Sequence, residues 1–214
     1  MHDILKNNSL YLERRPQTLA NHLREINPDT SLELITAGSG DWTVRKNYLD
    51  GSHRFLHSSI DPREEARVWT GSQRVILPSL IIIGVGLAYH VFELLQNCKN
   101  FENVYLIEAD ERLFQLAMKV HDFSSLIHNA SVHFLIAPPL THIEKIFSTS
   151  ITQPFSCHIF FPVVSSCLTI YNPIKELIEM HLYTIRLRKQ DDDTPDYLPF
   201  PKGVEYLLDR LSTP

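Results

Sequence analysis

Two glycines and one acidic residue are the groups in this sequence best placed to bind a small molecule. Gly84 and Gly86 lie in the segment GVGLAYH directly after an apolar run, and Glu108 ends a second apolar run, 24 residues after Gly84. Glycine lets a ligand approach the backbone, and the amides at a helix start face it. An acid at the end of the next strand commonly binds ribose hydroxyls. The sequence therefore predicts a site for a nucleotide or an S-adenosylmethionine-like ligand.

Four other polar side chains are expected at the rim of this site, because ligands of open α/β sheets lie beyond the carboxyl ends of the strands. An alternative interpretation assigns the glycines to a tight turn, Glu108 to a helix cap and His90 to a polar contact at a helix start. Asp61 is itself expected to be mainly a helix cap. The four rim residues are Asp61, Glu65, Tyr89 and His90.

The remaining reactive side chains form no recognisable catalytic or metal-binding set in the sequence. There is no Gly-x-Ser-x-Gly elbow, and the pair Ser165-Ser166 is expected in a loop. The histidines show no pair at metal-ligand spacing that is backed by carboxylates. Catalytic residues therefore stay unassigned, and no metal site is predicted. The histidines considered are His57, His121, His133 and His158, and the cysteines Cys98, Cys157 and Cys167 are expected to be reduced core thiols.

Composition excludes several classes of function. The chain has 214 residues, 43% of them hydrophobic, and a formal net charge of -5 with a pI near 6.1. Such a chain lacks the positive field that attracts a polyanion, so nucleic acid is not an expected partner. Its apolar runs are too short to span a bilayer, and its N-terminus does not resemble a signal peptide. No membrane partner is expected, and the cytoplasm is the expected location.

The order of apolar segments predicts the elements that position the site. From Val75 onward, buried strands alternate with amphipathic helices, in the order VILPSLIIIG, a helix, VYLIEA, a helix and VHFLIA. Strands that are apolar on both faces belong inside a parallel sheet covered by helices. A further strand, HIFFPV, and a helix with Ile174 and Ile178 follow. The fold class is therefore α/β, Rossmann-like and methyltransferase-like, with a mostly parallel sheet.

A small N-terminal unit is expected before this domain. Residues 9–26 keep a helical period, and LELIT, WTVRK and HRFLH predict a small antiparallel β unit. The predicted boundaries are 1–56 for this unit and 57–214 for the Rossmann-like domain with its C-terminal helices. Asp61 followed by Pro62 predicts a helix start, because the carboxylate caps amides and proline suits the first helical position. A final short helix is expected over Val204–Leu211.

Three blocks of sequence together resemble a known family. They are HSSIDPREEA from His57, the segment GVGLAYH, and IEAD with its following helix and the segment HDFSS from His121. Their order, over about residues 10–185, resembles the N-terminal domain of the motility-associated factor (Maf) glycosyltransferases, which act in bacterial flagellin glycosylation. The family differs in having glycine where this chain has Ala88, and a glycine after the third strand where it has Ala137-Pro138-Pro139.

The resemblance implies a module of a glycosylation system. In the family, the sugar-transferring region lies in a following domain, and this sequence ends soon after Leu211. The resemblance assigns transfer chemistry to no residue here. The expected function is therefore a stand-alone accessory or partner-binding protein, whose protein partner supplies the transferase domain. The oligomeric state is left open.

A second family is similar in outline and gives an alternative function. Spermidine synthases and other S-adenosylmethionine-dependent methyltransferases also place a β unit before a Rossmann-like domain with a GxG turn. The acid that they carry just before that turn is replaced here by Ile81–Ile83, and HIFFPV ends without an acid to orient an amine. The alternative prediction is a transferase of this class.

Overall fold

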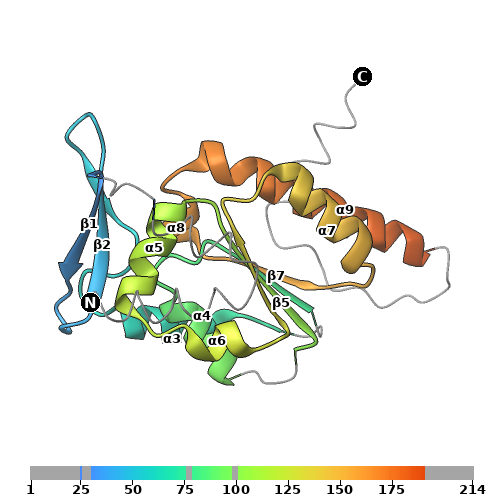
Figure 1. Cartoon of the computed structure of the whole chain (residues 1–214), viewed down its shortest axis with the longest axis horizontal. Helices are drawn as coiled ribbons and strands as arrows, with labels where there is room; N and C mark the ends of the chain where they lie inside the picture. The colour runs from blue at the N-terminus through green and yellow to red at the C-terminus, as the bar shows by residue number, and fades with distance from the viewer. Residues whose placement is uncertain (1–24, 26–29, 76–78, 98–100, 191–214) are drawn as a thin grey trace.

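A computed structural model describes residue 25 and residues 30–75, 79–97 and 101–190 (Figure 1). The expected helix over 9–26 lies outside these ranges except for Glu25, which is helical. The expected helix over Val204–Leu211 also lies outside them.

A four-stranded parallel sheet forms the centre of the molecule. Its strands are β4 (Ser79–Ile83), β5 (Asn103–Glu108), β6 (Val132–Ile136) and β7 (Ser156–Ile159), in the order β6-β5-β4-β7. The chain adds strands on one side of β4 and then returns to pair β7 on its other side. This is the strand order of one half of a doubly wound sheet, whose switch point lies between β4 and β7. The predicted Rossmann-like class is confirmed.

Helices cover both faces of this sheet. In Figure 1, α3, α4 and α6 lie on one side of β5 and β7, whereas α7 and α9 lie on the other. Their apolar stripes and the buried strands, such as Leu80–Ile83 at 0–1% exposure, make a continuous core. The helices are α3 (Pro62–Ser72), α4 (Tyr89–Asn97), α5 (Glu111–Val120), α6 (Ser124–His128), α7 (Leu140–Ser150), α8 (Phe161–Val164) and α9 (Leu168–Gln190).

The predicted antiparallel β unit is present beside this domain. It consists of β1 (Leu32–Thr36), β2 (Trp42–Asn47) and β3 (His53–Phe55), in the order β1-β2-β3. Contacts made by Tyr89 of α4 and Arg63 of α3 join it to these helices. The Tyr89 hydroxyl donates to the backbone oxygen of Trp42 at 2.9 Å and accepts from its amide at 3.1 Å, and Arg63 pairs with Asp41 at 2.8 Å. The unit is thereby fixed over the start of α4.

The strand over HIFFPV and the helices α6 and α7 differ from the sequence prediction, since neither of these helices was expected. The strand predicted over HIFFPV is wrong in its second half, because β7 ends at Ile159 and α8 begins at Phe161. Pro162 has no amide proton for a strand ladder, but it suits the first turn of a helix. Helix α7 was not predicted, and it begins directly after Pro138-Pro139.

Candidate functional site

The glycine turn, residues 84–88, joins the carboxyl end of β4 to α4 at the switch point of the sheet. Gly84 and Gly86 have φ values of +84° and +53°, and Ala88 also has a positive φ of +67°. Residues with a side chain rarely adopt this region, which costs roughly 1 kcal/mol for alanine. Ala88 therefore adopts a left-handed conformation that glycine favours.

Glu108 holds the glycine turn in place from the end of β5. Its Oε2 atom accepts hydrogen bonds from the amides of Val85 and Gly86, both at 2.9 Å. Its Oε1 atom accepts from the Asp110 amide at 2.9 Å and from the Tyr171 hydroxyl. Both oxygens of this fully buried carboxyl group are thus engaged inside the protein. The arrangement ties β4, β5 and α9 together.

The ionisation of Glu108 reflects two opposing causes. Burial raises the pKa of Glu108 to about 7, while the hydrogen bonds from Tyr171, Asp110 and Gly86 favour the charged form and lower it. The raised pKa means that this group's contribution to stability is fully present below pH 4.5 and is lost as the pH rises toward 7.

His57 satisfies the next amide of the glycine turn. Its Nε2 atom accepts a hydrogen bond from the Leu87 amide at 2.8 Å, and the whole residue is only 2% exposed. Because Nε2 accepts, the neutral ring carries its proton on Nδ1, which lies 3.5 Å from the Glu65 carboxylate. Burial lowers the pKa of His57, and the neighbouring Glu65 opposes this effect. The ring is therefore neutral at pH 7.

The missing side chain of Gly86 makes room for the protein's own residues. A Cβ atom there would overlap the imidazole of His57 and would lie 2.7 Å from Cγ2 of Val163. At Gly84, a Cβ atom would lie 3.0 Å from Val164. Glycine in this turn thus lets side chains of the protein itself lie close to the backbone.

His90 lies in the core rather than at a rim. It is 0% exposed, and its Nε2 atom donates to the Gly84 carbonyl at 3.0 Å. Its ring stacks on Phe160 with centroids 3.8 Å apart and an interplanar angle of 7°, and it meets Trp69 edge-on at 4.9 Å. Burial, followed by the neighbouring His57, lowers the pKa of His90 well below its usual value.

The two predicted acidic rim residues support the start of α3. Asp61 accepts hydrogen bonds through Oδ1 from the amides of Arg63 at 3.0 Å and Glu64 at 2.9 Å, as expected of a helix cap. Glu65 accepts from the Ser58 amide at 2.9 Å. The segment that carries His57 is thereby fixed by the helix that follows it.

Most of the predicted site residues therefore fall into two groups. Gly84, Gly86, Glu108 and His90 form one buried cluster, in which each polar contact above is internal to the protein. Tyr89 instead lines a half-open groove between α3 and α4, with a volume of about 280 Å³. The glycines make the tight turn of the structural interpretation, but Glu108 is not the expected helix cap, because Asp110 caps α5 and Glu108 binds the amides of the turn. The ligand-binding interpretation stays a prediction. Asp61 and Glu65 belong to neither group, and they lie at the N-terminal end of α3.

Sequence reasoning missed two members of the buried cluster, His57 and Tyr171. His57 contacts a residue 30 positions away and Tyr171 one 63 positions away, so no local pattern reveals either contact. The signal that could have revealed His57 was the presence of both the HSSIDP block and the GVGLAYH block. In the structure, His57 of the first block binds the Leu87 amide of the second.

Membrane spans and metal clusters are both absent from the described residues. Within them, no helix is long and apolar enough to cross a membrane. Among the same residues, no group of three or more histidine, cysteine, aspartate or glutamate side chains is arranged to hold a metal ion.

Comparisons with known proteins agree with the resemblance. A family model described as the glycosyltransferase Maf N-terminal domain matches residues 4–137. The solved structure of a Maf glycosyltransferase from Magnetospirillum magneticum AMB-1 is similar in fold, with a TM-score of 0.58 and 12% sequence identity. The similarity covers 79% of this chain and 34% of that one, so this chain spans about a third of the length of that enzyme. No curated protein matches the sequence.

Proposed function

Because the chain belongs to the family of glycosyltransferase Maf N-terminal domains, we propose that it serves protein glycosylation as a partner-binding module that does not transfer sugar itself. The partner supplies the sugar-transfer domain, and the acceptor is bacterial flagellin. The module works in the cytoplasm.

The engagement of the glycine turn is the observation that carries this proposal. The amides of Val85, Gly86 and Leu87 donate to Glu108 and His57, so the groups that would bind a nucleotide stabilise the fold instead. A carboxylate with internal donors on both oxygens is also poorly suited to bind ribose or to act as a base. The spermidine synthase and methyltransferase alternative depends on a free acid at Glu108, and the geometry gives it no support.

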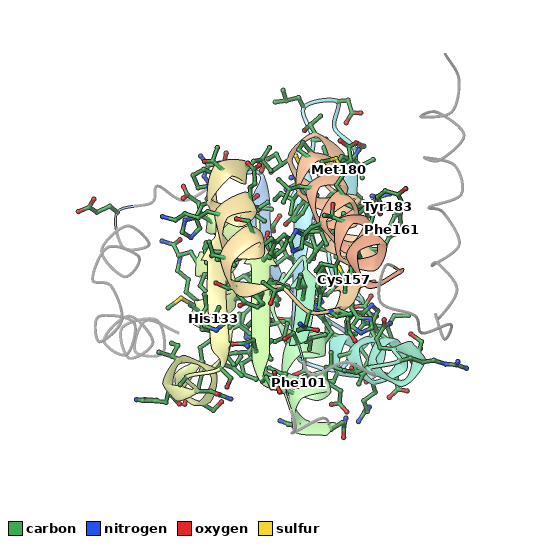
Figure 2. All side chains as sticks on the ribbon, turned by 90° about the vertical axis from the view of Figure 1, so that its right-hand side faces the viewer. Phe101, His133, Cys157, Phe161, Met180 and Tyr183 are labelled. Carbon is green, nitrogen blue, oxygen red and sulfur yellow. The ribbon has the colours of Figure 1, made fainter. Side chains whose placement is uncertain are left out.

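The surface of α8 and α9 supports a protein partner. Phe161, Met180 and Tyr183 are large apolar side chains with exposures of 67%, 71% and 45%. Met180 and Tyr183 lie three residues apart, so they share one face of α9. Figure 2 labels all three, on the side of the molecule that α9 forms. Aromatic residues and methionine are enriched in protein interfaces, so we assign this face to the partner.

The proposal is tested by mixing this chain with the sugar-transfer region of a full-length Maf glycosyltransferase from the same organism. We expect calorimetry to detect binding, and the double variant Met180→Glu, Tyr183→Glu to bind at least tenfold more weakly, because charges would be buried against an apolar surface. Leu49→Glu is the matched control, since Leu49 is fully exposed on the β unit. This variant should bind as the unmodified chain does.

A transfer assay supplies the second half of the test. The chain alone should transfer no sugar from activated donors to flagellin, whereas addition of the chain to the transfer region should increase transfer. Sugar transfer by the purified chain alone would contradict the proposal. So would equal binding by the α9 double variant and the unmodified chain.

A further inference from the structure

The lining of the groove between α3 and α4 carries groups of both charges. Arg63 and Arg67 lie on the α3 side, where Arg63 pairs with Asp41 at 2.8 Å and Arg67 with Glu64 at 2.7 Å, and the carboxylates Glu93 and Asp122 lie elsewhere in the lining. Arg63, Ala66 and Arg67 line it from α3 at helical spacing, so they form one face of that helix. From α4 it is lined by Tyr89, Phe92, Glu93 and Gln96, and His121 and Asp122, which follow α5, also line it. The small side chain of Ala66 leaves room between the helices. The groove of about 280 Å³ is large enough for a molecule of the size of a free amino acid.

The aromatic part of the groove is rigid. The Tyr89 hydroxyl is held by both backbone groups of Trp42. The His121 ring meets the Tyr89 ring edge-on at 4.5 Å and lies 5.5 Å from the Phe92 ring. Burial, followed by the neighbouring Arg63, lowers the pKa of His121 to about 4, so this ring is neutral at pH 7. The rings therefore offer a fixed apolar surface.

The charged groups of the lining keep atoms that can bind a ligand. Arg63 uses Nε for its bond to Asp41 at 2.8 Å, so its terminal nitrogens can donate to another acceptor. Elsewhere in the lining, Glu93 of α4 accepts from Asn97 through Oε1 at 3.0 Å, and Asp122 after α5 accepts from the Ser124 amide through Oδ1 at 2.8 Å. The second oxygen of each carboxylate can accept from a ligand.

The balance of charge selects the ligand class. A phosphate or other anion that reaches the two arginines is also repelled by Glu93 and Asp122. A simple cation that reaches these two carboxylates is repelled by the arginines. Only a molecule with both charges satisfies both sets of groups. We propose that this groove binds a free α-amino acid with an apolar or aromatic side chain. Its carboxylate faces Arg63 and Arg67, its ammonium group faces Glu93 and Asp122, and its side chain packs on Tyr89 and Phe92.

Three related probes test the charge requirement. L-phenylalanine carries both charges, 2-phenylethylamine lacks the carboxylate, and 3-phenylpropionate lacks the ammonium group, while the ring is the same. Titration followed by amide NMR shifts should give a Kd for L-phenylalanine of about 1 mM, as expected of a ligand of this size. Each single-charge probe should bind at least tenfold more weakly.

Matched variants test the location. Arg67→Glu and Glu93→Gln should each weaken L-phenylalanine binding at least tenfold. The controls are Lys145→Glu and Glu144→Gln on α7, which lies on the other side of the sheet from the groove (Figure 1). Both controls should leave the affinity unchanged. Circular dichroism verifies that each variant keeps its fold.

Two outcomes overturn this inference. One is an absence of L-phenylalanine binding at about 10 mM, or equal binding of 3-phenylpropionate, which would make the groove an anion site. The other is binding that survives both groove variants, which would place the ligand elsewhere. Neither result bears on the partner-binding proposal, because that proposal concerns α8 and α9.

Discussion

Replacement of His57 tests whether a side chain from the HSSIDP block holds the glycine turn. In His57→Ala, the buried Leu87 amide loses its acceptor and the space beside Phe160 loses a ring. In His57→Gln, the amide oxygen can take the place of Nε2 and accept the same hydrogen bond. The two variants therefore separate the hydrogen bond from the rest of the side chain.

The expected magnitudes follow from burial. An unpaired buried amide costs about 1–3 kcal/mol, and removal of a buried ring about 3 kcal/mol. His57→Ala should thus lower the free energy of unfolding by roughly 4 kcal/mol at pH 7.5, and His57→Gln by roughly 2 kcal/mol less than that. Urea unfolding, monitored by circular dichroism, measures both values.

The same variants predict a pH dependence. Because burial lowers the pKa of His57 below its ordinary 6.5, its stabilising contribution is present above pH 6.5 and is lost as the pH falls. As the pH falls from 6.5 to 5.5 the unmodified protein should lose stability through this residue, and His57→Gln should remove that part of the loss. The exposed His142 provides the control, because His142→Gln should leave the dependence of the unfolding free energy on pH unchanged.

Two results would refute this reasoning. If His57→Ala costs less than about 1 kcal/mol, the Leu87 amide finds another partner and His57 does not hold the turn. If His57→Gln shows the same pH slope as the unmodified protein, the acid sensitivity arises from other groups, such as His90.

Three further changes probe the same cluster and the helix start. Gly86→Ala should destabilise by roughly 2–4 kcal/mol because its Cβ meets Val163 and His57, whereas Gly40→Ala, with a positive φ but open space, should cost only about 1 kcal/mol by thermal unfolding. Glu108→Gln replaces one acceptor oxygen by a donor and should cost about 2–4 kcal/mol in urea unfolding. Asp61→Ala should cost about 1 kcal/mol and Asp61→Asn close to none, because asparagine also caps helices; a large loss with Asn would indicate a functional charge.

The sequence alone was sufficient to predict the strands and the helix cap whose signals lie within a few neighbouring residues. The runs that became β4, β5 and β6 are apolar on both faces, and turn residues bound them. The Asp61-Pro62 cap is also local, because the donors that it satisfies lie two and three residues away. The parallel direction of these strands follows from the alternation of strand and helix, whereas the position of β7 beside β4 was not predicted.

The positive φ values of Ala88 and Ala137 show where residue type is a poor guide. Neither alanine signals a left-handed conformation, so the sequence suggested that the turn departs from the family pattern. The structure keeps the glycine-like backbone at both positions. Tertiary packing thus overrides the local preference of alanine, which costs only about 1 kcal/mol at each.

The role of Glu108 could not be predicted because a strand-end acid has the same sequence position whether it binds ribose or the turn itself. Its partners, the amides of Val85 and Gly86 and the Tyr171 hydroxyl, are set by the packing of α9 and the turn against β5. These partners come from distant parts of the chain, so no local sequence pattern reveals them.

Amide hydrogen exchange at Val85, Gly86 and Leu87 tests the central claim, that the protein's own side chains occupy this turn. We expect these three amides to exchange as slowly as those of β4. Their rates should not change when S-adenosylmethionine or nucleotide sugars are added. Fast exchange of the three amides, or new protection on addition of one of these ligands, would contradict the claim and identify the turn as a ligand site.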